Sequence, residues 1–340
     1  MKKERVYYLD IVKVIALIMV FTCHFTRSLE RNEVGFVCKV LPDEVCNLYL
    51  GSFGVTLFFI ASGASLMYVY SDKLNLGYYI KKRFTGIYPM FWIAFFIATG
   101  ISFFRNQSIQ PQGIPKWKIL YSILGFDGNA LWWGPNYYQL GEWFLSVIIL
   151  LYLLFPLLRI GVKKFPIVTL TGSLILLALC ILFFHTKLPI ECFVLARVAE
   201  FVFGMVFMEY VKKVQLWKAG IGVLGLILTA FINFSTVNVM IQTLIVGISG
   251  FLVLSWVGER LSGYQLVKNI SLISGKYCYP FFLTHHYLLE WMTERFQGLT
   301  LSRSAVYLLY LFCFIVTVIV TRLLYEGNKQ VLLFLNIQKR

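Results

Sequence analysis

Long apolar stretches follow one another along the chain, separated by short segments that carry most of its Lys and Arg residues. An α-helix that crosses a bilayer needs about 20 consecutive, mostly apolar residues. Ten stretches meet this need, so the pattern predicts an all-α, polytopic membrane protein in which residues 1–340 form a single integral-membrane domain. The expected transmembrane helices are 8–26, 49–70, 84–104, 139–158, 166–184, 192–210, 217–233, 238–256, 269–290 and 304–323.

Composition agrees with the pattern, because 59% of the residues are hydrophobic and 14% are charged. Soluble domains are usually about 45–50% apolar and about 25% charged. An ordinary soluble enzyme, a disordered chain and a disulfide scaffold are therefore excluded. The net charge of +15 comes from 31 Lys and Arg against 16 Asp and Glu. Such an excess is typical of nucleic-acid binding or of basic cytoplasmic loops.

The positions of the basic residues decide between these two explanations. With a cytoplasmic N-terminus, 19 of the 31 fall in inner segments or at the inner ends of spans (Lys218 and Arg322), nine fall in outer segments, and Lys13, Arg197 and Lys276 lie deeper within spans. This bias predicts that both termini face the cytoplasm. The expected location is the cell membrane. The basic residues form no single stripe, so no nucleic-acid partner is expected.

The seven cysteines do not form a disulfide framework. Cys38 and Cys46 share the first outer loop, where a structural disulfide and two free thiols are both open alternatives. No Cys/His spacing resembles a zinc site, so no metal is expected. The longest gap between spans, residues 105–138, contains Trp, Gly and Pro, and is expected to hold a re-entrant or interfacial segment.

Ionisable residues within a span are costly, which makes them functional candidates. Lys13 and His24 are 11 residues apart, which is about three helical turns, so they lie on one face with an axial separation of about 16 Å. Asp10 precedes Lys13 by three residues and can pair with it. His24 is the best acid/base candidate because its unperturbed pKa is near neutrality. The competing explanation is that Lys13 snorkels and His24 is structural.

The other spans hold weaker candidates. Arg197 and Glu200 have the spacing of a helical ion pair, and a structural pair competes with a site. His285 and His286 are adjacent in a helix, about 100° apart, so at most one is expected to face a shared cavity. The remaining candidates are Ser62 among small residues of the second span, the basic loop Lys81, Lys82 and Arg83, and Glu142 beside the interfacial Trp143.

Six motifs, in order, resemble the membrane acyltransferase-3 family, the integral-membrane acyltransferases that modify cell-surface glycans. The resemblance covers nearly the whole chain. Two positions depart from the pattern, because Gly86 and Ile148 stand where many members carry Arg and Glu. The motifs are Tyr8 to His24 with its basic residue, ten-residue gap and histidine, Phe58 to Gly63, Lys82 to Pro89, Trp143 through Tyr152 to Pro156, Arg197 to Met205, and Tyr279 to His285.

The resemblance implies an O-acyltransferase whose donor, usually acetyl-CoA, enters from the cytoplasm and whose acceptor is a hydroxyl of an extracytoplasmic or lipid-linked glycan. His24 would be the general base or would itself accept the acyl group. The basic residues Lys13, Lys82, Arg83 and Arg197 would hold CoA phosphates. A polar donor among Ser62, Tyr152 and His285 would stabilise the oxyanion. Asp10, Glu142, Trp143 and Glu200 would support the site.

Two other classes of function compete with an acyltransferase. Polar residues within spans are also typical of a transporter or flippase for a lipid-linked sugar. An inverted repeat would favour a transporter, and no convincing repeat is found in the sequence. A non-catalytic membrane scaffold is the third alternative, and it leaves the shared face of Lys13 and His24 unexplained.

Overall fold

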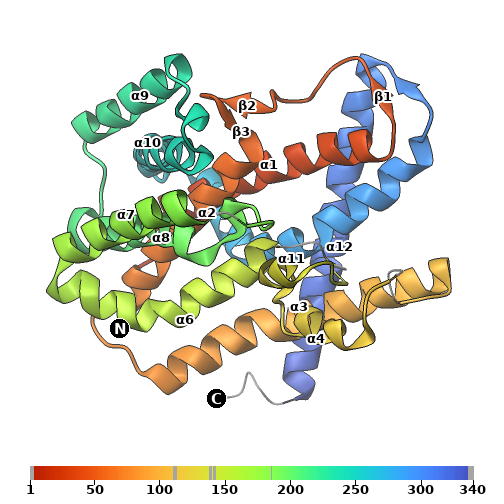
Figure 1. Ribbon diagram of the computed structural model, residues 1–340, viewed down its shortest axis with the longest axis horizontal. Helices are drawn as coiled ribbons and strands as arrows, with labels where there is room; N and C mark the ends of the chain where they lie inside the picture. Colours follow the sequence, from red (N-terminus) through yellow and green to blue (C-terminus); the bar gives the residue numbers. More distant parts are fainter. Residues whose placement is uncertain (1–3, 110–112, 138–139, 141–142, 185, 336–340) are drawn as a thin grey trace. The chain divides into compact units, whose positions relative to one another are not determined.

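The computed structural model describes residues 4–109, 113–137, 140, 143–184 and 186–335. Most of these residues are helical (Figure 1). The α-helices are α1 (Tyr7–Arg31), α2 (Leu50–Tyr70), α3 (Leu76–Asn106), α4 (Ile119–Ile123), α5 (Asp127–Ala130), α6 (Trp143–Lys164), α7 (Pro166–Phe183), α8 (Val194–Val206), α9 (Leu216–Phe231), α10 (Val239–Leu261), α11 (Gln265–Thr293) and α12 (Arg303–Phe334).

The short elements connect these helices. The strands are β1 (Gly35–Phe36), β2 (Glu44–Val45), β3 (Leu48–Tyr49) and β4 (Thr300–Leu301). The 3₁₀ segments are η1 (Lys116–Lys118), η2 (Leu131–Trp133), η3 (Ile190–Cys192), η5 (Phe234–Thr236) and η6 (Glu294–Phe296), and η4 (Phe207–Val211) is a π-helical turn at the end of α8.

Seven of the described helices are long and apolar enough to cross a membrane, judged by length and composition: α1, α2, α3, α6, α7, α10 and α12. These seven match seven of the ten expected spans and confirm an all-α membrane protein. The other three expected segments are helical as well, but α8 has 13 residues, α9 has 16, and the 29-residue α11 is more polar. Ten spans and cytoplasmic termini stay predictions.

The helix α3 begins eight residues before the expected start of the third span. Asn75 caps it by accepting a hydrogen bond from the backbone N–H of Tyr78 (2.9 Å). A side-chain cap of this kind satisfies one of the free N–H groups at a helix start. The interpretation of Lys81, Lys82 and Arg83 as a loop is therefore wrong, because all three lie in the first turns of α3.

The chain divides into two compact units. Unit 1 comprises Met1–Val20, Pro42–Leu74 and Val147–Gly275, and unit 2 comprises Phe21–Leu41, Asn75–Ser146 and Lys276–Arg340. The helices α1, α6 and α11 each contribute one end to each unit.

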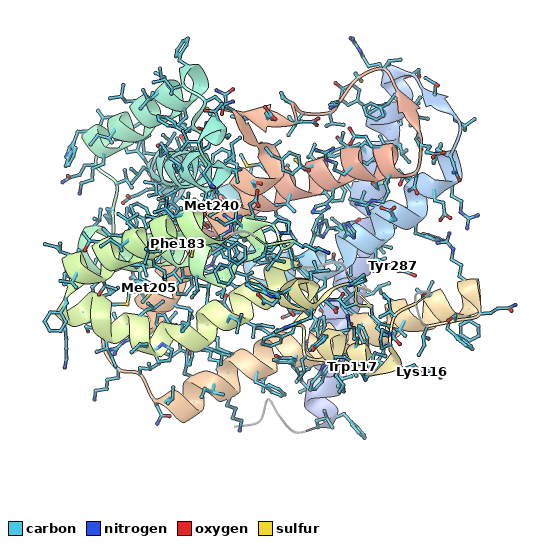
Figure 2. All side chains as sticks on the ribbon, viewed as in Figure 1. Lys116, Trp117, Phe183, Met205, Met240 and Tyr287 are labelled. Atoms are coloured by element: carbon cyan, nitrogen blue, oxygen red, sulfur yellow. The ribbon has the colours of Figure 1, made fainter. Side chains whose placement is uncertain are left out.

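In unit 1, α8 packs against both α2 and α7, and α10 packs against both α9 and α2 (Figure 1). Two glycines allow α2 and α8 to approach closely. A Cβ atom on Gly63 would overlap the carbonyl of Phe201, and one on Gly204 would overlap the carbonyl of Ile60. This confirms that small residues of the second span serve close helix packing. Met240, labelled in Figure 2, lies in a core cluster with Leu177, Cys180, Ala196 and Ala199.

In unit 2, α3 packs against α12, and the parallel pair β1–β4 joins the chain after α1 to the chain before α12. The segment from η1 to η2 returns along α3. Trp92 Nε1 donates to the carbonyl of Ile123 (2.8 Å), and the Tyr88 hydroxyl donates to the carbonyl of Leu124 (3.0 Å). Trp92 and Tyr88 precede Arg105 by 13 and 17 residues, about 20–26 Å along the helix. The segment therefore lies along α3, and its placement as a re-entrant or an interfacial segment stays a prediction.

Candidate functional site

Three histidines meet in unit 2. His24 lies on α1, and His285 and His286 lie on α11. The ring of His24 has its centroid 5.1 Å from that of His285 and 4.9 Å from that of His286. The expectation that at most one of the adjacent histidines faces a shared site is wrong, because both rings contact His24. The cluster brings together two of the predicted catalytic residues.

His285 is completely buried, and its ring orientation is set by its own helix. Its Nδ1 lies 2.7 Å from the carbonyl oxygen of Phe282 and 3.2 Å from that of Phe281. A carbonyl oxygen can only accept, so Nδ1 carries the proton and donates it. His24, in contrast, is partly exposed.

Aromatic rings surround the histidine cluster on the α1 side. Phe21 is fully buried, and its ring lies 5.4 Å from each of the rings of Phe281, Tyr310 and Phe314. Tyr310 shares a hydrogen bond of 2.8 Å with Thr22. Apolar walls of this kind lower the local dielectric constant, which strengthens hydrogen bonds and charge interactions at the cluster.

Polar contacts fix the register of α1 against α11 beyond the cluster. Arg31 and Glu290 form an ion pair of 2.9 Å. The Asn32 side chain donates to the Glu290 carbonyl (3.0 Å) and to the Thr293 hydroxyl (2.8 Å). We call these contacts of Arg31 and Asn32 with Glu290 and Thr293 the lock. Arg31 follows His24 by about two helical turns, so the lock holds His24 at the level of the α11 histidines.

Four of the predicted residues belong to unit 1: Asp10 and Lys13 on α1, Ser62 on α2 and Tyr152 on α6. Lys13 Nζ donates to the Ser65 hydroxyl at 2.7 Å, one turn beyond the buried Ser62 on α2. Asp10 forms an ion pair of 2.6 Å with Arg5. Tyr152 on α6 has its ring centroid 6.5 Å from that of Phe201. Lys13 and Asp10 therefore each have a polar partner, Ser65 and Arg5 respectively.

Arg197 and Glu200 form an ion pair inside unit 1, with Nη1 and Oε1 separated by 2.7 Å. Both side chains are fully buried. Arg197 also donates to the Glu191 carbonyl (2.8 Å), Thr56 Oγ1 lies 3.4 Å from both members of the pair, and the guanidinium stands 5.4 Å from the centre of the Phe59 ring. The predicted pairing is confirmed.

The remaining candidates lie in unit 2. Lys82 stands over the Tyr78 ring at 5.7 Å, and Arg83 stands over the Tyr79 ring at 6.0 Å. Trp143 begins α6, where a Cβ on Gly128 would meet its Cα. Glu142 lies outside the described residues.

Two further expectations concern a disulfide between Cys38 and Cys46 and a metal site. Cys38 and Cys46 are free thiols, so the structure has no disulfide between them. Among the residues described, no group of three or more His, Cys, Asp and Glu side chains is arranged to hold a metal ion.

Sequence reasoning missed Ser65 and the lock formed by Asn32, Glu290 and Thr293. Ser65 carried a signal, because a Lys inside a span needs a polar partner and Ser65 follows Ser62 by three residues on an apolar helix. The lock carried none, since Asn32 and Glu290 are 258 residues apart.

Comparison with known proteins places the chain in a family. The family model described as an acyltransferase domain matches residues 6–326. The chain belongs to this acyltransferase family. The resemblance based on the six motifs is thereby confirmed. No solved structure matches this family member.

One curated relative is acyltransferase MdmB of Streptomyces mycarofaciens. It is 25% identical to the chain over 237 residues, which is 60% of the chain. The aligned region is 56% of MdmB, so the chain spans about half the length of this relative.

Proposed function

We propose that the chain is a membrane O-acyltransferase that transfers an acetyl group from cytoplasmic acetyl-CoA to a hydroxyl of an extracytoplasmic or lipid-linked glycan. The acceptor class comprises exopolysaccharide, capsule and other envelope polymers, and the proposed location is the cell membrane. Membership of the acyltransferase family supports acyl transfer. Acetyl and glycan specificity rest on the family resemblance.

The observation that carries the proposal is the partly exposed His24 held against a buried histidine in an apolar setting. Acyl transfer to a hydroxyl needs a base that removes the hydroxyl proton while the new C–O bond forms. A neutral imidazole is suited to this because its unperturbed pKa lies near neutrality. In the alternative two-step route, the same nitrogen accepts the acyl group before the sugar does.

The acyl donor, acetyl-CoA, would be held by positively charged side chains. CoA carries phosphates, which Lys and Arg side chains bind through charge-assisted hydrogen bonds. Lys13, Lys82 and Arg83 are the proposed phosphate contacts, because Lys82 and Arg83 lie near the start of α3, on the predicted cytoplasmic side. Ser62 and Tyr152 are the proposed hydrogen-bond donors to the oxyanion that develops on the thioester carbonyl.

The test is acetyl transfer by the purified full-length protein in lipid nanodiscs. Release of free CoA from acetyl-CoA, and transfer of labelled acetyl to a glycan extract, are followed for the wild type and His24→Ala. Loss of the base should lower the rate about 10²–10⁴-fold. Arg27→Ala is the matched control, because this exposed residue lies one turn further along α1 and its ion pair with Glu30 contributes little.

Two results would contradict the proposal. A wild-type protein that binds glycan lipid but releases no CoA and transfers no acetyl would favour a transporter. An unchanged rate in His24→Ala would remove His24 from the chemistry. Mass spectrometry of surface glycans from cells with and without the gene identifies the acceptor through a lost acetyl mass.

A further inference from the structure

His285 holds a buried polar atom that the structure leaves without a hydrogen-bond partner among the described residues. This atom is Nε2. Burying a polar group without a hydrogen bond costs free energy, so such an atom requires a physical explanation, of which a functional role is one. The other ring nitrogen, Nδ1, is fully engaged by the carbonyls of Phe282 and Phe281.

The hydrogen bond made by Nδ1 of His285 determines whether Nε2 carries a proton. Because Nδ1 donates its proton to the Phe282 carbonyl, the neutral imidazole of His285 has no proton on Nε2. The Nε2 atom is therefore a hydrogen-bond acceptor, and it has no N–H with which to stabilise an oxyanion. This differs from the donor role expected for His285 from the family resemblance.

The neighbour best placed to donate is His24. An N–H···N hydrogen bond of about 2.9 Å between two imidazoles places the ring centres roughly 5 Å apart. The centroids of His24 and His285 are 5.1 Å apart, at an interplanar angle of 78°. A rotation of the partly exposed His24 ring about its side-chain bonds would direct one N–H at Nε2, while the buried His285 stays anchored by its backbone bonds.

We propose that His285 is a positioning residue that accepts a hydrogen bond from one ring nitrogen of His24 and so leaves the other nitrogen of His24 unprotonated and directed at the acceptor hydroxyl. The proposal rests on the proposed acyltransferase function. A third group that orients the catalytic base through its far nitrogen is a recurrent arrangement in acyl-transfer sites.

The transfer step balances with these roles. The acceptor oxygen forms a bond to the acetyl carbon, and the hydroxyl proton moves to the free nitrogen of His24. The C–S bond of the thioester breaks, and the proton passes from His24 to the sulfur of CoA. Throughout, the second N–H of His24 remains bonded to Nε2 of His285, which keeps the ring from turning away.

Two isosteric substitutions separate this role from packing. In His285→Gln, the amide oxygen can occupy the position of Nε2 and still accept from His24. In His285→Asn, the amide nitrogen can occupy the position of Nδ1 and still donate to Phe282, but no acceptor faces His24. We expect His285→Gln to keep kcat within about threefold of the wild type and His285→Asn to lower kcat at least about tenfold, both with unchanged KM for acetyl-CoA.

The same pair of substitutions at His286 is the control. Its ring also contacts His24, so a packing effect should appear there too, but without a difference between Asn and Gln. Equal losses in His285→Asn and His285→Gln, or a preference for Asn, would overturn the proposal.

A measurement without turnover separates this proposal from the proposed function. Nitrogen-15 NMR of histidine-labelled protein in nanodiscs, assigned with the His285→Gln variant, reports which ring nitrogen of His285 carries the proton. We expect Nδ1. A proton on Nε2 would overturn the acceptor role even in an active enzyme, whereas a protonated Nδ1 in a protein that transfers no acetyl would count against the acyltransferase function alone.

Discussion

Replacing Glu200 by Gln removes one charge from the buried ion pair of unit 1 and changes little else. The amide oxygen of Gln can still accept from Arg197 Nη1, so the hydrogen bond of 2.7 Å is retained in kind. What is lost is the negative charge beside a guanidinium that is fully buried. The substitution therefore measures mainly the charge interaction, together with the placement of an amide NH2 where Oε2 lies.

Two physical considerations give the expected loss in the free energy of unfolding. At 2.7 Å and an effective dielectric constant of about 20, the attraction between unit charges is about 6 kcal/mol. Breaking a buried ion pair by removing one partner usually costs about 3–5 kcal/mol, because the remaining charge is left uncompensated. We expect Glu200→Gln to lower the free energy of unfolding by about 3–5 kcal/mol. The double variant Arg197→Met/Glu200→Leu removes both charges and should recover most of this loss.

The assay is thermal unfolding in detergent, followed with a fluorogenic thiol reagent. Cys180 and Cys192 are buried in unit 1 and become reactive when it opens. The control is Glu44→Gln, the same substitution at an exposed position of unit 1, which should change stability by less than about 0.5 kcal/mol. If Glu200→Gln melts with the control and instead raises the KM for acetyl-CoA, the pair serves the donor and does not stabilise the fold.

Two further variants test packing and donor binding. Gly63→Ala places a methyl group on the Phe201 carbonyl and should destabilise the α2–α8 contact by about 1–3 kcal/mol, whereas Gly86→Ala, with no atom within 4 Å, should be neutral or slightly stabilising in the same melting assay. Lys82→Ala should raise the KM for acetyl-CoA about 3–10-fold without changing kcat. The control Lys116→Ala, on the predicted opposite side of the membrane, should leave this KM unchanged. Equal effects of the two Lys variants on KM would refute the phosphate role of Lys82.

The class of fold could be predicted from the sequence because each expected transmembrane helix corresponds to one contiguous apolar stretch. Boundaries were harder to predict. Lys81 and Lys82 appear in the sequence as a basic loop, yet the Asn75 cap starts α3 before them. Charged side chains at the end of a helix can extend to the aqueous interface, so polarity alone does not mark where a helix begins.

The candidate site could be predicted in part. Lys13, His24, Arg197 and Glu200 stand out because charge within an apolar helix is costly. The meeting of His24 with both α11 histidines could not be predicted, because it depends on how two helices separated by more than 200 residues pack. The angle of about 100° between adjacent helical side chains predicted that only one of the two α11 histidines faces the site. The ring of His24 lies between the two side chains and contacts both.

The return of the segment after α3 has a consequence for biosynthesis. The carbonyl of Ile123 accepts a hydrogen bond from Trp92, and the carbonyl of Leu124 accepts one from Tyr88. Backbone carbonyls at the end of a helix within a bilayer are tolerated only where such partners exist. A ribosome delivers α3 before it delivers these carbonyls, so the donors that a membrane-embedded segment would need are synthesised before the segment itself. Chain order thus supplies the segment with an intramolecular guide for insertion, and a rearranged gene that encodes the segment ahead of α3 would leave it without one.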